Sequence, residues 1–210
     1  MLIWLNGPFG GGKTQTAYEL RRRLAGSVVC DPEEVGFGLH RMTPGHLRGD
    51  FQDLPSWRTG VRDVLGLVLE RHPGVVIAPM TVSEPSHLDE IVAPLRARGH
   101  DVRHFSLLAR RETVVRRLRE RGFGRAVRVV GGKEAPLRRE SFALARLDEC
   151  LERLVMPAFA EQVWTDDRTV SEVADLIADA TGQSLAPDLD GPLRGRLRRA
   201  GVGLRHIRFL

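Results

Sequence analysis

Short apolar runs alternate along this chain with longer stretches whose apolar positions recur every three or four residues. The runs are bounded by Gly, Pro or Asp and have the length of buried strands, whereas the three-four spacing is typical of amphipathic helices. The predicted strands are 2–5, 28–30, 75–78, 102–108 and 163–164. The predicted helices are 13–24, 57–69, 85–98, 112–121, 138–154 and 171–180. This alternation predicts an α/β fold, a three-layer sandwich with a central five-stranded parallel sheet and helices on both faces.

Three details refine this pattern. Ser171, followed by Glu172, predicts the start of the last helix, because serine is a good N-cap before an acidic first turn. Residues 31–56 are rich in Gly, Pro, His and Asp and are predicted to be an insertion over the carboxyl edge of the sheet. Residues 122–137 are cationic and bracketed by glycines, as expected of an Arg-rich lid.

The first predicted strand runs into a glycine-rich loop of the pattern G-x-x-x-x-G-K-T, and a helix follows at once. In this context the loop is typical of phosphate binding, because backbone N–H groups and the helix N-terminus converge on phosphate oxygens. Lys13 is expected to reach the β- and γ-phosphates, and the Thr14 hydroxyl to ligate Mg²⁺. The predicted nucleotide-binding residues of the loop are Gly7, Pro8, Phe9, Gly10, Gly11, Gly12, Lys13, Thr14 and Gln15.

Composition narrows the class of protein. Only two of the 32 basic residues are lysines, and one of these, Lys13, is in the loop. Residues 110–140 hold eleven basic and four acidic side chains, a net charge of +7, and residues 191–210 hold six arginines and no acid. Basicity confined to two segments argues against a general nucleic-acid surface. Two distant cysteines, and a loop too close to the N-terminus for a cleavable leader to precede it, predict a cytoplasmic protein.

The residues that follow the other predicted strands bear on the reaction. The strand at 75–78 ends in Pro-Met-Thr without a carboxylate, which argues against GTPases and motor ATPases. Asp31, in contrast, directly follows the strand at 28–30, where it can act as a general base toward an acceptor hydroxyl or support Mg²⁺ through water. The alternative is that Asp31 only begins a turn or caps a helix near Pro32.

Cationic side chains are expected beside the transferring phosphoryl group. Arg117 and Arg121 are four residues apart on one helix face before the predicted lid, so both can address the nucleotide; a solvated charged face is the alternative. Trp57 and Arg58 can hold an acceptor or can serve only packing. The scattered histidines show no ligand spacing, so no metal other than Mg²⁺ is expected.

The C-terminal segment, 182–210, has a pattern of its own, and a first domain is predicted over 1–181. If the segment is helical, its apolar residues form one narrow stripe, made of Leu193, Leu197, Ala200, Leu204 and Ile207. Its six arginines lie off this stripe. Such a basic amphipathic segment can dock on its own domain or lie on an anionic membrane or partner, and both interpretations stay open.

Segments along nearly the whole chain carry a family resemblance: Ile3–Gly7, Phe9–Gly10, Gly12–Ala17, Asp31–Glu33, Gly36–Phe37, Asp50–Gln52, Trp57–Arg58, Pro79–Thr81, His104–Phe105, Thr165–Asp166 and Leu204–Arg208. On these residues the chain resembles the P-loop small-molecule kinases of the nucleoside-monophosphate-kinase-like group and, more closely, the tunicamycin-resistance protein family.

The resemblance implies an ATP-binding protein that protects a bacterium from tunicamycin, a uridine-containing antibiotic with many hydroxyls, and peripheral membrane contact through the C-terminal segment. It implies Asp31 as the acceptor-side carboxylate, Arg117 against the adenine, and Thr165 with Asp166 in the adenine loop. The predicted catalytic residues are Lys13, Asp31, Arg117 and Arg121, and the predicted acceptor-binding residues are Asp31, Phe37, Trp57, Arg58 and Thr81. The expected activity is ATP-dependent phosphorylation of tunicamycin or a similar compound; the alternatives are sequestration without chemistry and a kinase for another hydroxylated metabolite.

Overall fold

The structure is a computed structural model that describes residues 1–121, 147–159 and 161–189. Its centre is one parallel sheet of five strands, as predicted, and the structure gives their order as β2-β3-β1-β4-β5. The strands are β1 (Leu2–Asn6), β2 (Val28–Val29), β3 (Val76–Pro79), β4 (Val102–Leu108) and β5 (Gln162–Trp164). All five lie within two residues of their predicted bounds, because short apolar runs between turn residues mark buried parallel strands clearly.

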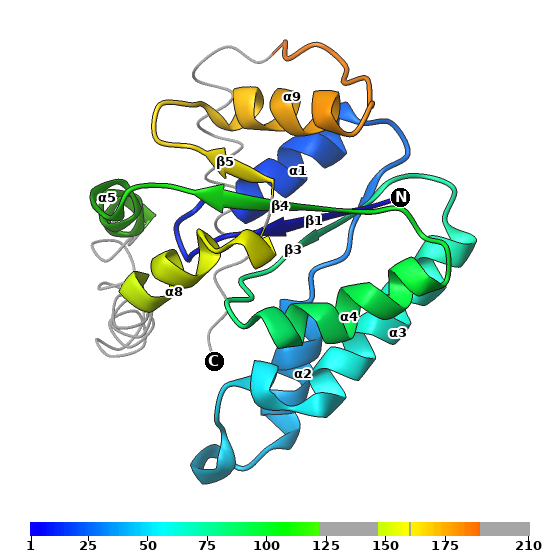
Figure 1. The fold of residues 1–210 in the computed structure, drawn as a ribbon, viewed down its shortest axis with the longest axis vertical. Coiled ribbons are helices and arrows are strands. Elements are labelled where there is room, and N and C mark those ends of the chain that lie inside the picture. The colour runs from blue at the N-terminus through cyan, green and yellow to red at the C-terminus, as the bar shows by residue number, and fades with distance from the viewer. Residues whose placement is uncertain (122–146, 160, 190–210) are drawn as a thin grey trace, which may run out of the picture.

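Helices cover both faces of the sheet (Figure 1). One face carries α1 (Lys13–Arg23) and α9 (Val170–Ala180), and the other carries α3 (Pro55–Arg71), α4 (Pro85–Ala97) and α8 (Leu147–Leu154). Helix α5 (Arg111–Arg121) lies beyond the carboxyl end of β4, next to α8. The predicted helix 138–154 is described only from residue 147 onward, and the predicted lid lies outside the described residues.

Each strand of the sheet divides its side chains between the two layers. On β1, Leu2 and Trp4 pack toward α3 and α4, whereas Ile3 and Leu5 pack toward α1 and α9. All four are fully buried. This explains why β1 reads as a continuous apolar run rather than an alternating one, since both of its faces are covered.

The insertion over residues 31–56 contains a helix that is missing from the predicted helices and appears in the sequence analysis only as the alternative role of Asp31. Helix α2 spans Glu33–Met42 and is followed by two short 3₁₀ turns, Gly45–Leu47 and Phe51–Asp53. The two glycines of this helix are more typical of a loop, which is why the sequence pattern does not indicate a helix clearly. Gly36, however, is required for packing, because a Cβ there would lie 2.6 Å from the ring of Phe51.

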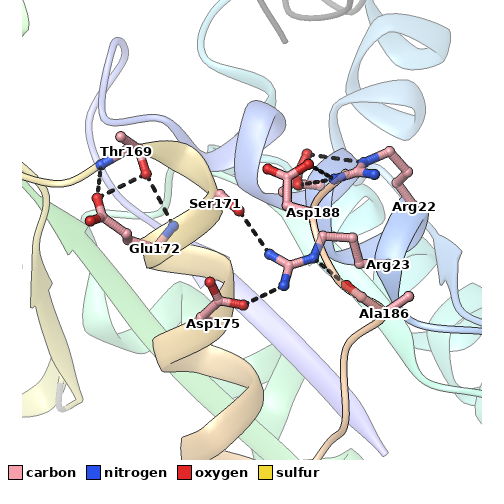
Figure 2. Close-up of polar contacts among 9 residues, drawn as sticks. Arg22, Arg23, Thr169, Ser171, Glu172, Asp175, Ala186 and Asp188 are labelled. Carbon is pink, nitrogen blue, oxygen red and sulfur yellow. Dashed lines mark hydrogen bonds and ion pairs between the residues drawn. The ribbon is translucent and has the colours of Figure 1, made fainter. Parts of the chain in front are cut away.

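The predicted start of the last helix needs a correction of two residues. Thr169, not Ser171, is the N-cap of α9: its hydroxyl accepts from Glu172 N, and the Glu172 carboxylate accepts from Thr169 N at 2.7 Å (Figure 2). This reciprocal capping box outcompetes a simple serine cap. Ser171 instead accepts a hydrogen bond from Arg23 at 2.8 Å.

The chain beyond Thr181 begins by packing on the first domain. Ala186 N donates to Arg23 O at 2.8 Å. Arg23 Nε donates back to Ala186 O, also at 2.8 Å (Figure 2). Leu185 packs on the core beside α1, and Arg22 pairs with Asp188 at 2.7 Å. The predicted apolar stripe from Leu193 to Ile207 lies outside the described residues. Among the helices that the structure describes, none is long and apolar enough to cross a membrane.

Candidate nucleotide and acceptor site

The glycine loop joins the carboxyl end of β1 to the N-terminus of α1. Gly7 adopts φ +147°, and a Cβ there would lie 2.5 Å from Leu107 O, so only glycine lets the loop leave the sheet beside β4. Gly10 adopts φ +83° and lies against Val114 and Leu118 of α5. The loop is thus wedged between β4 and α5, and the first turn of α1 carries no acidic residue that would neutralise its N-terminal partial charge.

Lys13 is folded onto the loop that it belongs to. Its ammonium donates to Gly7 O at 2.9 Å and to Pro8 O at 3.0 Å, and lies 5.7 Å from the centroid of the Phe9 ring. The side chain is 8% exposed. The only cation inside the loop is therefore held by backbone carbonyls, which a phosphate oxygen can replace as a stronger partner. Thr14 and Gln15 follow in the first turn of α1 and are partly buried.

Asn6 takes part in this site although sequence reasoning missed it. The residue is fully buried at the end of β1, and its Oδ1 accepts from Gly7 N at 2.8 Å. The same side chain also binds Val82, in the segment after β3. The signal in the sequence was an amide at the end of an otherwise apolar strand, which a buried position tolerates only when its hydrogen bonds are satisfied.

The predicted adenine-side residues come together at the ends of β4 and β5. The Arg117 guanidinium donates to Thr165 Oγ1 at 2.9 Å and to Thr165 O at 2.6 Å. Asp166 accepts from Arg110 N at 3.0 Å, at the start of α5. Burial opposes ionisation of the Asp166 carboxyl, but hydrogen bonds from Thr113 and Arg110 outweigh it, so the pKa of Asp166 is lowered. The loop that follows β5 is thus fastened to α5, the helix on which Gly10 packs. The Arg121 side chain lies outside the described part of the chain.

Asp31, the predicted acceptor-side carboxylate, lies just past the carboxyl end of β2. Cys30 N still donates to Ile77 O of β3, so Asp31 is the first residue beyond the sheet. It is partly buried, and its Oδ1 accepts from Glu33 N at 3.0 Å. Asp31 therefore holds the first turn of α2, which is the alternative role predicted for it, and it lies at the same carboxyl edge of the sheet as the glycine loop.

The aromatic residues predicted for acceptor binding are packed in the insertion. Trp57 is fully buried and donates from Nε1 to Pro32 O at 3.0 Å. Phe37 is also buried, and its ring meets that of Phe51 edge-on at 6.3 Å between centroids. Through Phe51, which both rings contact, they help to hold α2 against α3, and their predicted role in acceptor binding stays a prediction.

The arginines at the acceptor edge are paired with carboxylates. Arg58, mostly buried, donates to Glu90 at 2.5 Å and to Gln52 O at 2.6 Å. Arg153 of α8 binds Glu84, at the start of α4, at 2.6 Å. In the described residues no group of three or more His, Cys, Asp or Glu side chains could hold a metal ion. Thr81, by contrast, follows β3 with its hydroxyl buried and without a hydrogen-bond partner in the described chain.

Loop, sheet order and helix arrangement define a kinase-like P-loop protein that binds a nucleotide. A family model described as an AAA domain matches residues 2–135. The solved structure of the tunicamycin resistance protein of Deinococcus radiodurans is similar with a TM-score of 0.69 and 32% sequence identity, over 89% of this chain and 98% of that one. The chain belongs to this P-loop family and, within it, to the tunicamycin resistance proteins.

More distant structures share the fold. The APS kinase CysC of Mycobacterium tuberculosis, solved with AMPPNP and APS, has a TM-score of 0.54 and 16% identity, over 87% of this chain and 97% of that one. The shikimate kinase of Bacteroides thetaiotaomicron has a TM-score of 0.53 and 21% identity, over 87% and 98%. These likenesses bear on the fold alone. A comparison with curated proteins gave no significant match.

Proposed function

We propose that this protein is an ATP-dependent phosphotransferase that transfers the γ-phosphoryl group of ATP to a hydroxyl of tunicamycin or a similar nucleoside-like compound. The observation that carries the proposal is the shared sheet edge: Lys13 in its glycine loop follows β1, and the carboxylate of Asp31 follows β2. A phosphoryl donor and a group able to orient an acceptor hydroxyl are thereby brought to one side of the molecule.

The donor half follows from the loop. The phosphates of ATP would replace Gly7 O and Pro8 O as partners of Lys13, and the N–H groups of the loop and of the first turn of α1 would bind phosphate oxygens. Thr14 would be the protein ligand of Mg²⁺, which would neutralise charge on the phosphates of the nucleotide. Arg117, fixed by Thr165, would lie beside the adenine.

The acceptor half rests on Asp31. Its carboxylate would accept the proton of the attacking hydroxyl as the new P–O bond forms and the bond from the γ-phosphorus to the β–γ bridging oxygen breaks, leaving ADP. The product would carry about two additional negative charges, enough to spoil its fit to a target that binds the neutral drug. Arg121 and the predicted lid at 122–137 would supply further cations around the phosphoryl group.

The direct test incubates the purified protein with Mg²⁺, ATP and tunicamycin and follows the drug by mass spectrometry. We expect a product heavier by one phosphate group, and its absence would overturn the proposal. Asp31→Asn should abolish turnover. Asp50→Asn is the matched control, because Asp50 also accepts from the backbone N–H two residues on, Gln52 N, at 3.0 Å. Equal turnover in the two variants would remove Asp31 as the base.

A second candidate is sequestration of the drug without chemistry. The hydrogen bond from Glu33 N to Asp31 favours it, because a carboxylate that holds the first turn of a helix need not be catalytic. Saturable binding of tunicamycin with no ATP turnover, lost on deletion of 191–210, would support it. That result would also support membrane contact through the C-terminal segment.

A kinase for another hydroxylated metabolite is the third candidate, and a substrate panel tests it through kcat/KM. Cytoplasmic residence and the lack of a nucleic-acid partner stay predictions from composition.

A further inference from the structure

Asn6 is the only asparagine of the chain, and the residue that follows it is Gly7. An asparagine before glycine is chemically labile, because glycine has no Cβ to hinder the attack of its backbone nitrogen on the side-chain amide. Proteins of hyperthermophiles carry fewer asparagines for the same chemical reason. The pair stands at the head of the phosphate-binding loop, so a change in its covalent structure would alter the nucleotide site.

The fold requires both members of this pair. A Cβ on Gly7 would lie 2.5 Å from Leu107 O, so a bulkier residue that would slow the reaction cannot follow Asn6. The Asn6 side chain both accepts and donates: Oδ1 accepts from Gly7 N at 2.8 Å and from Val82 N at 2.9 Å, and Nδ2 donates to Val82 O at 2.8 Å. A carboxylate lacks the donor, and a longer amide would have to displace the neighbours of a fully buried residue. The labile pair is therefore built into the loop.

The same contacts keep the amide unreactive while the loop is closed. Ring closure requires that the Gly7 nitrogen lose its proton and meet Cγ of Asn6. In the structure this nitrogen instead directs its N–H at Oδ1, and the two bonds to Val82 fix the plane of the amide. Asn6 is fully buried, which keeps the base and water that the reaction needs away from it. The reaction therefore requires an opening that breaks the contacts of Asn6 with Gly7 N and Val82.

We propose that Asn6–Gly7 is a latent deamidation site, and that its reaction during such openings converts the protein irreversibly into a form that no longer binds nucleotide. The Gly7 nitrogen bonds to Asn6 Cγ to give a five-membered imide, and Nδ2 leaves as ammonia. Water then opens the imide at either of its carbonyl carbons, which leaves an aspartate or an isoaspartate at position 6. In the net reaction one amide and one water give one carboxylic acid and one ammonia.

Neither product restores the native contacts. The carboxylate of an aspartate cannot donate to Val82 O, and it would place a charge in a fully buried position. An isoaspartate adds a methylene to the main chain exactly where β1 passes into the loop. Bound nucleotide, in turn, should slow the reaction, because ligand on the loop stabilises the closed form by mass action. This inference depends on nucleotide binding alone, so it is independent of the acceptor and of phosphoryl transfer.

Matched variants of Val82 test whether the hydrogen bonds control the site. Val82→Pro and Val82→Ala both change the packing of a fully buried residue, but only proline lacks the N–H that Asn6 Oδ1 accepts. In native buffer Asn6 should deamidate about threefold to tenfold faster in Val82→Pro than in Val82→Ala. Equal rates in the two folded variants would overturn the inference. If Val82→Pro does not fold, the wild-type experiment that follows decides.

The wild-type experiment follows the tryptic peptide 1–13, which carries the only asparagine, by mass spectrometry and isoaspartate labelling. The full chain is kept in mildly alkaline buffer in three states: native, native with a saturating non-hydrolysable ATP analogue, and unfolded in urea. We expect conversion in urea, at least about a hundredfold slower conversion in the native protein, and slower conversion still with the analogue. The native protein should lose analogue binding in proportion to the converted peptide. No conversion in urea, native conversion as fast as in urea, no effect of the analogue, or loss of binding with the peptide intact would each overturn the inference.

Discussion

The Asn6 side chain binds the backbone of Val82 at two points: Nδ2 donates to Val82 O at 2.8 Å, and Oδ1 accepts from Val82 N at 2.9 Å. Because Oδ1 also accepts from Gly7 N, one buried amide joins the start of the phosphate-binding loop to the segment that follows β3. The Asn6 side chain thereby holds both the donor side and the predicted acceptor side of the site in place, although it contacts no substrate itself.

Asn6→Asp should make turnover depend on pH in a way that the wild type does not. A carboxylate cannot donate to Val82 O, but a protonated acid can, and burial raises the pKa of such an acid. We expect a loss on the order of a hundredfold at pH 8, with recovery relative to the wild type as the pH falls. The measurement is the ratio of variant to wild-type kcat at each pH. Asn6→Ala should stay low throughout, and a ratio for Asn6→Asp that does not change with pH would contradict this role.

Two glycines of α2 should respond to alanine in opposite ways. A Cβ on Gly36 would meet the Phe51 ring at 2.6 Å, whereas a Cβ on Gly38 would meet nothing within 4 Å. Gly36→Ala should lower the free energy of unfolding by about 1–3 kcal/mol through overpacking. Gly38→Ala should raise it by about 0.4–1 kcal/mol, because alanine has less backbone freedom to lose. Urea denaturation of both variants is the measurement, and changes of the same sign would refute the packing argument.

Arg23 should be the main anchor of residues 183–189. Its buried guanidinium donates to Ala186 O, Ser171 Oγ and, at 2.6 Å, Asp175 Oδ1 (Figure 2). Arg23→Met should cost about 2–4 kcal/mol in the free energy of unfolding, because charge-assisted bonds are lost and their acceptors stay behind. Arg21→Met, at an exposed position of the same helix, should cost at most about 1 kcal/mol. Equal losses in a denaturation experiment would show that Arg23 contributes no more than a surface arginine.

His104 should make the protein less stable in acid. Burial, and secondarily Arg96, lower its pKa from 6.5 to about 4, so the unfolded chain binds a proton between these values that the folded protein does not. The free energy of unfolding should therefore be greatest above pH 6.5 and fall as the pH drops toward 4, by up to roughly 3 kcal/mol. His104→Gln should flatten this part of the profile, and His46→Gln, at an exposed position, should not. Parallel profiles for His104→Gln and the wild type would argue against this assignment.

The sequence predicted the strands and most of the helices. It predicted less well the roles of residues whose side chains pack against distant parts of the chain. The motif around Lys13 and the apolar runs can be recognised because each signal lies in residues that are adjacent in the sequence. The helix at 33–42 was predicted only as an alternative near Pro32, because Gly36 resembles a loop residue until Phe51 is placed against it. Trp57 and Arg58 are predicted acceptor contacts, but the sequence does not reveal their partners Pro32 O and Glu90, which are distant along the chain.

By itself, the sequence determined the phosphate-binding loop, the parallel sheet, the placement of Asp31 after a strand and the family resemblance. These follow from spacing along the chain, since glycine positions, apolar periods and strand ends are local properties. Only the tertiary structure decided that Asn6 joins Gly7 to Val82, that Arg23 holds Ala186, and that Trp4 lies opposite His104. The physical reason is that burial and hydrogen-bond satisfaction depend on neighbours across strands and layers, and residues far apart in the chain become neighbours only in the folded sheet.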